Sequence, residues 1–213
     1  MKYKLVIFDW DGTLMDSVAR IVSCMEDTAQ ELQLPIPSQS AVRNIIGLSL
    51  YKALPLLFDG LTEQDIERLL LTYRRHYLEL NTTPTPLFAG AKNIIKGLHD
   101  DGYQLAVATG KQRAGLDIAL AESALGPYFH ALRGADQALS KPDPLMLSQI
   151  LEELQLKPTE AVMVGDSSYD LAMAQAIGMD RIGVTYGVHS APILQEFSPR
   201  ALVDDIRQLP TFL

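Results

Sequence analysis

The sequence of 213 residues predicts an α/β fold, in which a doubly wound parallel sheet carries an inserted all-helical unit. Short apolar runs without polar alternation recur along the chain, and such runs are typical of strands buried on both faces. Segments with helical spacing separate the later runs, and this alternation favours a doubly wound sheet. Residues 16–83 interrupt the alternation because they contain only helical patterns.

Four apolar runs give the expected strands, which are Leu5–Phe8, Leu105–Ala108, Ala161–Val164 and Ile182–Val184. The first three runs stop abruptly at polar or glycine residues. Ligands of open α/β sheets bind at the carboxyl ends of the strands. We therefore expect the functional residues directly after these runs.

The helical unit is expected from its apolar spacing and its helix-start signals. An apolar stripe between Val18 and Leu32 predicts a first helix, and Thr62 with Asp65 predicts the start of a later one. A threonine- and proline-rich stretch at residues 81–86 is typical of a stiff linker. We therefore expect a helical unit of residues 16–83 and a core of residues 1–15 and 84–213.

Composition excludes several classes of partner. The chain has 26 acidic and 18 basic side chains, a net charge of −8, which repels nucleic-acid phosphates. No apolar run approaches the roughly 20 residues of a membrane span, and Leu5–Phe8 is too short for a signal-peptide core. The single cysteine, Cys24, is expected to be a buried thiol and fits a reducing compartment. We expect a cytoplasmic protein that binds neither nucleic acid nor membrane.

Two carboxylates, Asp9 and Asp11, follow the first expected strand. Carboxylates this close resist full ionisation unless a cation lies between them. Oxygen ligands suit Mg²⁺, a hard cation. The alternative is an acidic strand-end turn, because Asp11-Gly12 is also a turn signal.

A second acidic pair follows the run Ala161–Val164. Asp166 could reach the same cation if the two strands are neighbours. Asp170, one helical turn later, could bond a metal-bound water. Asp166 could equally cap the helix that follows.

Two further positions offer groups that bind phosphate. Thr109 and Gly110 supply a hydroxyl and backbone N–H groups at a strand end. Lys141 lies between Ser140 and Pro142, in a proline-rich stretch that would hold it as a fixed point charge. The alternatives are an ordinary strand-to-helix turn and an exposed loop lysine. Taken with the carboxylates, these groups favour a site for phosphoryl transfer.

The motifs also occur in the order of a known family. The chain resembles the haloacid dehalogenase (HAD) superfamily of aspartate-nucleophile phosphohydrolases, particularly its phosphoglycolate-phosphatase-like branch. The matching motifs are Phe8–Leu14, Thr109, Lys141 with its Lys-Pro-Asp-Pro context, and Gly165–Asp170. The resemblance covers nearly the whole chain and implies a Rossmann-like core with a helical cap inserted after the first motif.

The resemblance implies Mg²⁺ bound by the side chains of Asp9 and Asp166 and the backbone carbonyl of Asp11. It implies that Asp9 attacks phosphorus to form an aspartyl-phosphate, and that Asp11 protonates the leaving group and then activates water. Lys141 and Thr109 would neutralise the phosphoryl charge. Dehalogenases and phosphonate-cleaving relatives lack an aspartate at the position of Asp11, so we expect a phosphatase.

We expect a small phosphorylated metabolite as the substrate, and a monomer or weak homodimer. The helical cap would close over the site and contact the leaving group. Arg43 is the candidate cap contact, beside the segment of residues 45–50. The alternative for Arg43 is an exposed helix arginine.

Two other functions fit parts of the pattern. A phosphomutase of the β-phosphoglucomutase kind uses the same scaffold, although its relatives more often have valine or alanine at the position of Thr13. A receiver-like signalling domain would also combine strand-end carboxylates, a hydroxyl and a lysine. Receivers are shorter and have no inserted helical cap, so this pattern favours an enzyme.

Overall fold

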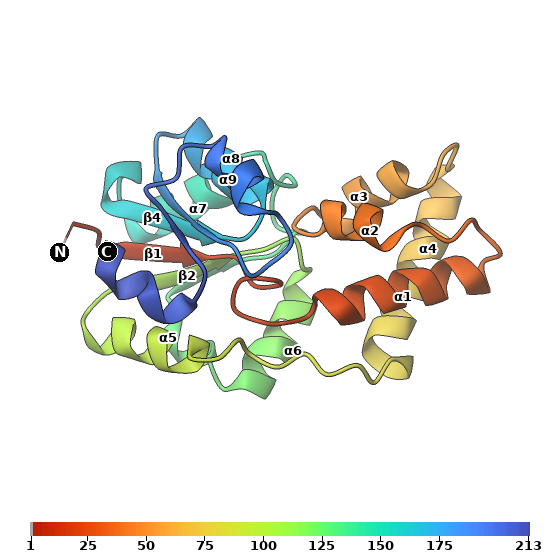
Figure 1. Cartoon of the computed structure of the whole chain (residues 1–213), viewed down its shortest axis with the longest axis horizontal. Coiled ribbons are helices and arrows are strands. Elements are labelled where there is room, and N and C mark those ends of the chain that lie inside the picture. The colour runs from red at the N-terminus through yellow and green to blue at the C-terminus, as the bar shows by residue number, and fades with distance from the viewer. Residues whose placement is uncertain (1) are drawn as a thin grey trace.

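The computed structural model describes residues 2–213. Within this range six parallel strands form one sheet in the order β3-β2-β1-β4-β5-β6 (Figure 1). The strands are β1 (Leu5–Phe8), β2 (Gln104–Ala108), β3 (Ala131–Arg133), β4 (Ala161–Gly165), β5 (Asp180–Val184) and β6 (Ala201–Val203). The first strand in the chain therefore lies at the centre, and the order reverses on either side of it. Such a reversal creates a crevice at the carboxyl edge of the sheet.

Helices cover both faces of the sheet, as a doubly wound fold requires. One face packs against α5 (Ala91–Asp100), α6 (Arg113–Ser123) and the 3₁₀ segment η4 (Ile206–Phe212). The other face packs against α7 (Leu145–Leu154) and α8 (Ser168–Ala176), and α9 (Ala191–Gln195) contacts α8 (Figure 1). Short 3₁₀ turns, η2 (Gly126–Tyr128) and η3 (Pro158–Glu160), complete the core.

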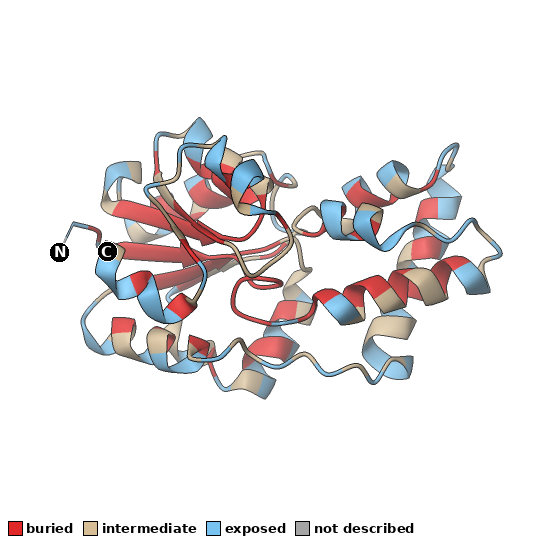
Figure 2. Cartoon of the chain, in the orientation of Figure 1, coloured by how far each residue is buried: buried red, intermediate tan, exposed pale blue. Residues whose placement is uncertain are grey.

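The central strands are apolar on both sides because each side meets a layer of helices. Leu5 and Ile7 of β1 pack on one face, and Val6 and Phe8 pack on the other. All four are fully buried, and Figure 2 shows the sheet as the buried centre of the core. The uninterrupted apolar runs follow from this two-sided burial.

Five helical segments between β1 and α5 lie beside one another, away from the sheet (Figure 1). They are α1 (Val18–Glu31), α2 (Gln39–Ile45), α3 (Leu50–Leu57), α4 (Glu63–Arg75) and the π-helical turn η1 (His76–Leu80). We call residues 18–80 the helical unit. Its buried side chains form a separate apolar cluster. The expected start of α4 is confirmed, since Thr62 and Asp65 cap each other reciprocally.

The two connections between the helical unit and the core run side by side. The Asp16 amide donates to the Pro86 carbonyl at 2.8 Å, and the Phe88 amide donates to the Leu14 carbonyl at 3.0 Å. Met15 and Leu87 form an antiparallel bridge between them. The helical unit therefore leaves and rejoins the core at one place, next to the carboxyl end of β1.

The expected fold class and all four expected strands are confirmed. Strands β3 and β6 were not predicted from the sequence; they have three residues each and lie at the two edges of the sheet. Cys24 is buried, as expected, and burial raises the pKa of its thiol to about 12. Among residues 2–213, no helix combines the length and apolar character that a membrane crossing requires.

Candidate active site

Three neighbouring strands bring the predicted site residues together. Asp9 follows β1, Thr109 follows β2 and Asp166 follows β4, and β1 lies between the other two strands. The Asp9 amide continues the ladder by donating to the Val164 carbonyl at 3.0 Å. Because parallel strands end at the same edge, residues separated by more than 150 positions in the sequence become neighbours.

Lys141 reaches this edge from the loop after β3. Its Nζ lies 2.9 Å from Asp9 Oδ1 and donates to Asp170 Oδ1 at 2.6 Å. The lysine side chain has no solvent exposure, and neither does that of Asp170. Lys141 is therefore a buried, paired cation, and the exposed-loop alternative is excluded.

Asp170 holds the loop after β4 as well as Lys141. Its Oδ2 accepts from the Ser167 hydroxyl at 2.6 Å and from the Ser167 amide at 3.1 Å, which forms a capping box at the start of α8. Its Oδ1 accepts from Lys141. Both oxygens of Asp170 are thus engaged with protein donors.

Asp166 is fixed from several sides. Its Oδ1 accepts from the Thr13 hydroxyl at 2.7 Å, and its Oδ2 accepts from the Val188 amide at 2.9 Å. A Cβ atom on Gly12 would lie 2.3 Å from Asp166 Oδ2, and one on Gly187 would lie 2.2 Å from it. Gly12 also has a φ of +86°, so only glycine suits this approach.

Burial dominates the electrostatics of the carboxylates. It raises the pKa of Asp9 well above its ordinary value, and Lys141 offsets this effect only in part. Burial, reinforced by the charge of Asp170, raises the pKa of Asp166 to about 7. Burial alone would lower the pKa of Lys141, but Asp170 and Asp9 outweigh it and hold that pKa above its usual range.

The donor set fits a hard divalent cation. One oxygen each of Asp9, Asp166 and Asp170 lies within 4.8 Å of the others, and all three residues are buried. Asp9 Oδ1 accepts no hydrogen bond of good geometry from any residue that the structure describes. Three carboxylates face one ammonium here, and a divalent cation would compensate the excess negative charge.

Asp11 lies at the border between the core and the helical unit. Its Oδ1 accepts from the Ser17 hydroxyl at 2.6 Å, and its Oδ2 lies 3.1 Å from Lys111 Nζ. Lys111 also donates to the Tyr77 hydroxyl at 3.3 Å and lies 4.6 Å from the centre of that ring. Burial would lower the pKa of Lys111, but Asp11 and Tyr77 outweigh it and raise that pKa.

The β2 end presents the expected hydroxyl and glycine. Thr109 is 1% exposed, and its hydroxyl oxygen accepts from the Lys111 amide at 3.2 Å, so its hydrogen can point to an anion. Gly110 lies directly beneath the helical unit: a Cβ atom there would lie 2.5 Å from the Gly47 carbonyl oxygen. No side chain larger than hydrogen fits between these two backbones.

A cavity of about 780 Å³ opens between the helical unit and the core. Asp9, Asp11, Thr109 and Gly110 line it, and so does the whole predicted segment of residues 45–50. Arg43 does not line it. Arg43 is exposed on α2, and its one recorded contact is a long 3.4 Å bond to the Gly187 carbonyl.

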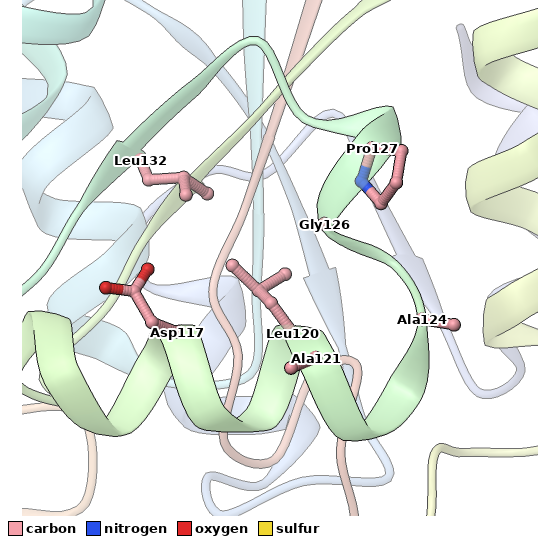
Figure 3. A pocket seen from close by; sticks show the side chains of 7 residues that line it. All are labelled: Asp117, Leu120, Ala121, Ala124, Gly126, Pro127 and Leu132. Atoms are coloured by element: carbon pink, nitrogen blue, oxygen red, sulfur yellow. The ribbon is translucent and has the colours of Figure 1, made fainter.

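A second hollow of about 410 Å³ lies between the end of α6 and β3 (Figure 3). Its walls are mainly apolar, and its carboxylate, Asp117, pairs with Arg113 at 2.8 Å. It contains none of the predicted site residues. The chemistry is therefore expected in the larger cavity.

Three polar residues in or beside the larger cavity were not predicted from the sequence. Lys111 follows Thr109 by two positions, so the strand-end rule that identified Thr109 could also have identified it. Ser17 directly precedes α1 and Arg20 lies in its first turn, and their sequence context carried no signal beyond helical spacing. Arg20 lines the cavity and donates to the Asn81 carbonyl.

Comparisons with known proteins agree with this arrangement. The family profile described as "Haloacid dehalogenase-like hydrolase" matches residues 6–184. A Dickeya dadantii (strain 3937) protein named "Probable phosphatase IndB" is 35% identical over 96% of this chain and 91% of its own length. A phosphoglycolate phosphatase of Vibrio vulnificus (strain YJ016) is 30% identical over 97% of this chain and 94% of its own.

A solved structure shows the same fold. The crystal structure of a predicted phosphatase from Clostridium acetobutylicum superimposes with a TM-score of 0.88 at 26% identity, and the match covers 99% of this chain and 98% of that one. The expected resemblance is confirmed by family profile, by sequence and by fold. The protein thus belongs to the haloacid dehalogenase-like hydrolases.

Proposed function

We propose that the protein is a Mg²⁺-dependent phosphatase that hydrolyses small phosphomonoesters through an aspartyl-phosphate on Asp9. The observation that carries this proposal is the buried Asp9 carboxylate at the base of the cavity. One of its oxygens accepts no hydrogen bond among the described residues, and a buried lysine lies 2.9 Å from it. The phosphatase names of the relatives support the same reaction class.

Asp9 acts as the nucleophile. Lys141 favours its ionised form and, as a cation beside it, neutralises charge on the transferring phosphoryl group. Asp170 positions Lys141 through a 2.6 Å contact. The Thr109 hydroxyl and the Gly110 backbone bind phosphoryl oxygens at the neighbouring strand end.

Asp11 acts as the general acid and then as the general base. Ser17 donates to one of its oxygens and Lys111 lies beside the other, so the carboxylate is held at the mouth of the nucleophile's site. In the first step it protonates the leaving alkoxide. In the second it takes a proton from the water that attacks the aspartyl-phosphate.

Asp9, Asp166 and the Asp11 backbone carbonyl would hold Mg²⁺. Asp170 fixes the neighbouring groups by accepting hydrogen bonds from Lys141 and Ser167. When bound, Mg²⁺ supplies electrostatic stabilisation of the phosphoryl oxygens. Thr13 and Val188 fix the Asp166 carboxylate before the cation arrives, because each donates to one of its oxygens.

We propose that residues 16–83 form a cap domain on a core of residues 1–15 and 84–213. The cap excludes water and contacts the leaving group through residues 45–50, which line the cavity, and not through Arg43. We further propose a cytoplasmic enzyme that is a monomer or a weak homodimer. Light scattering after size-exclusion chromatography measures the last point.

The test combines a phosphometabolite panel with a trap for the intermediate. The purified protein should release phosphate with Mg²⁺ and stop in excess EDTA. Acid-quenched mass spectrometry should find a phosphate-sized mass increase on the peptide that contains Asp9. Asp9→Asn should abolish both signals, whereas Asp101→Asn, at an exposed carboxylate after α5, should preserve them. Interconversion of sugar phosphates without phosphate release would indicate a mutase instead.

A further inference from the structure

The cavity continues well beyond the residues that handle phosphate. Its volume of about 780 Å³ lies in the range of about 300–1,000 Å³ that accommodates drug-sized ligands. Asp9 and Thr109, each 1% exposed, form its buried base. Tyr51, Leu78 and Ile118 also line it, and their exposures of 54%, 56% and 47% place them at its solvent side.

The helical unit contacts the core on two sides of this cavity. On one side the Ser49 amide donates to the Ser140 hydroxyl at 2.9 Å, and the Gly47 carbonyl touches Gly110. On the other side Lys111 of the core donates to Tyr77 of the helical unit. Because both sides are in contact, the space is a partly open chamber between two touching units and not a gap between separated bodies.

Three basic side chains also line the chamber. Lys111 is paired with Asp11 and donates to Tyr77, Arg74 donates to Gln112, and Arg20 donates to the Asn81 carbonyl while its buried Nε has no partner among the described residues. Polar groups therefore occupy only part of the chamber wall. The rest of the wall is mainly aliphatic and aromatic: Leu48, Leu50, Tyr51, Leu70, Leu78 and Ile118.

Three half-exposed apolar side chains that line the same cavity are unfavourable in water unless a ligand covers them. Scattered exposed apolar residues need no explanation, but apolar residues that line one cavity from several elements favour a ligand-binding site. Tyr51 comes from α3, Leu78 from η1 and Ile118 from α6, so both the helical unit and the core contribute to it.

We propose, on the basis of the proposed function, that the enzyme selects phosphomonoesters with a bulky, predominantly apolar leaving group, of about six carbons or more. The phosphate binds at Asp9, Thr109 and Lys141. The leaving group fills the chamber and reaches the opening formed by Tyr51, Leu78 and Ile118. A leaving group of two carbons leaves most of this apolar wall in contact with water.

The test uses a homologous series of n-alkyl phosphates, ethyl, butyl and hexyl. Their leaving alcohols have nearly the same acidity, so differences in rate report binding of the chain. Each methylene that enters an apolar wall should raise kcat/KM by about fourfold. Hexyl phosphate should therefore exceed ethyl phosphate by at least tenfold, with the increase levelling off once the chain reaches the opening.

Two variants locate the effect. Ile118→Ser and Leu78→Ser should each reduce the hexyl-to-ethyl ratio by about threefold to tenfold. Both residues are about half exposed, so the folded state tolerates the change. Leu71→Ser is the matched control, because Leu71 is 66% exposed on α4 but does not line the chamber. The hexyl-to-ethyl ratio of kcat/KM for this variant should equal that of the wild type.

Binding of n-alkylphosphonates, measured by calorimetry, separates this proposal from the proposed function. These compounds cannot be hydrolysed, so the Kd should fall along the series from ethyl to hexyl whether or not the protein turns over esters. A flat series of Kd and kcat/KM values would overturn the apolar chamber and leave the phosphatase intact. A rising affinity without any phosphate release would retain the chamber and overturn the phosphatase.

Discussion

Removing divalent cations with EDTA and lowering the pH from about 8 to about 5 should raise the free energy of unfolding of this protein. Asp166 is 1% exposed, and burial with the charge of Asp170 raises its pKa to about 7, whereas an unfolded aspartate titrates near about 3.9. The folded state therefore binds the proton more tightly. This contribution to stability is full below the unfolded pKa and is lost as the pH rises through about 7.

The size of the effect follows from the pKa difference. Each pH unit between the two pKa values changes the free energy of unfolding by about 1.36 kcal/mol. Acidification from about 7 to about 5 therefore adds roughly 3 kcal/mol from Asp166. Asp9, whose pKa is also raised by burial, adds to the change in the same direction.

Urea unfolding followed by the fluorescence of Trp10, the single tryptophan, measures this change at both pH values. Asp166→Asn removes one of the titrating groups and should reduce the gain by its share of roughly 3 kcal/mol. His189 works in the opposite direction, because burial lowers its pKa and stability is lost as the pH falls through about 6.5. The contribution of His189 is the same in the wild type and in Asp166→Asn, so it cancels when the pH dependence of one protein is subtracted from that of the other. Identical pH dependence in the two proteins would refute the reasoning.

Three further predictions concern four single substitutions. Asp9→Asn should abolish the aspartyl-phosphate, whereas Asp11→Asn should retain it and slow turnover of alkyl phosphates by about 10²–10⁴-fold, as seen by rapid quench. Lys141→Met should lower the free energy of unfolding in EDTA by about 3–5 kcal/mol at neutral pH, because it leaves buried carboxylates unpaired; unchanged urea midpoints would contradict this. Gly110→Ala should raise KM at least tenfold with little change in the melting temperature, because its Cβ would displace the Gly47 carbonyl and unseat the helical unit.

The fold was predictable where burial is uniform along an element. Strands β1, β2 and β4 lie between two layers of helices, so their uninterrupted apolar runs predict them from the sequence. Strands β3 and β6 have one strand neighbour each and only three residues. At that length neither period nor composition distinguishes a strand from a loop.

The site was predictable where chemistry coincides with the end of a strand. Asp9, Thr109 and Asp166 were found in this way, and the structure brings them to one edge. The burial of Lys141 was not foreseen, because it depends on Asp170 from the first turn of α8. Arg43 lies on a seven-residue helix, and only the packing of the helical unit on the core decides which of its sides meets the cavity.

The paired connectors have an evolutionary consequence. Asp16 bonds Pro86 and Phe88 bonds Leu14, so the chain departs from and returns to the sheet across a single short bridge. An insertion whose ends already touch can be lengthened, shortened or exchanged without moving any strand. Selection can therefore redesign the chamber wall while the carboxylates and Lys141 at the sheet edge stay in register, and lineages that share this edge can diverge in their ligands by changing a separable stretch of sequence.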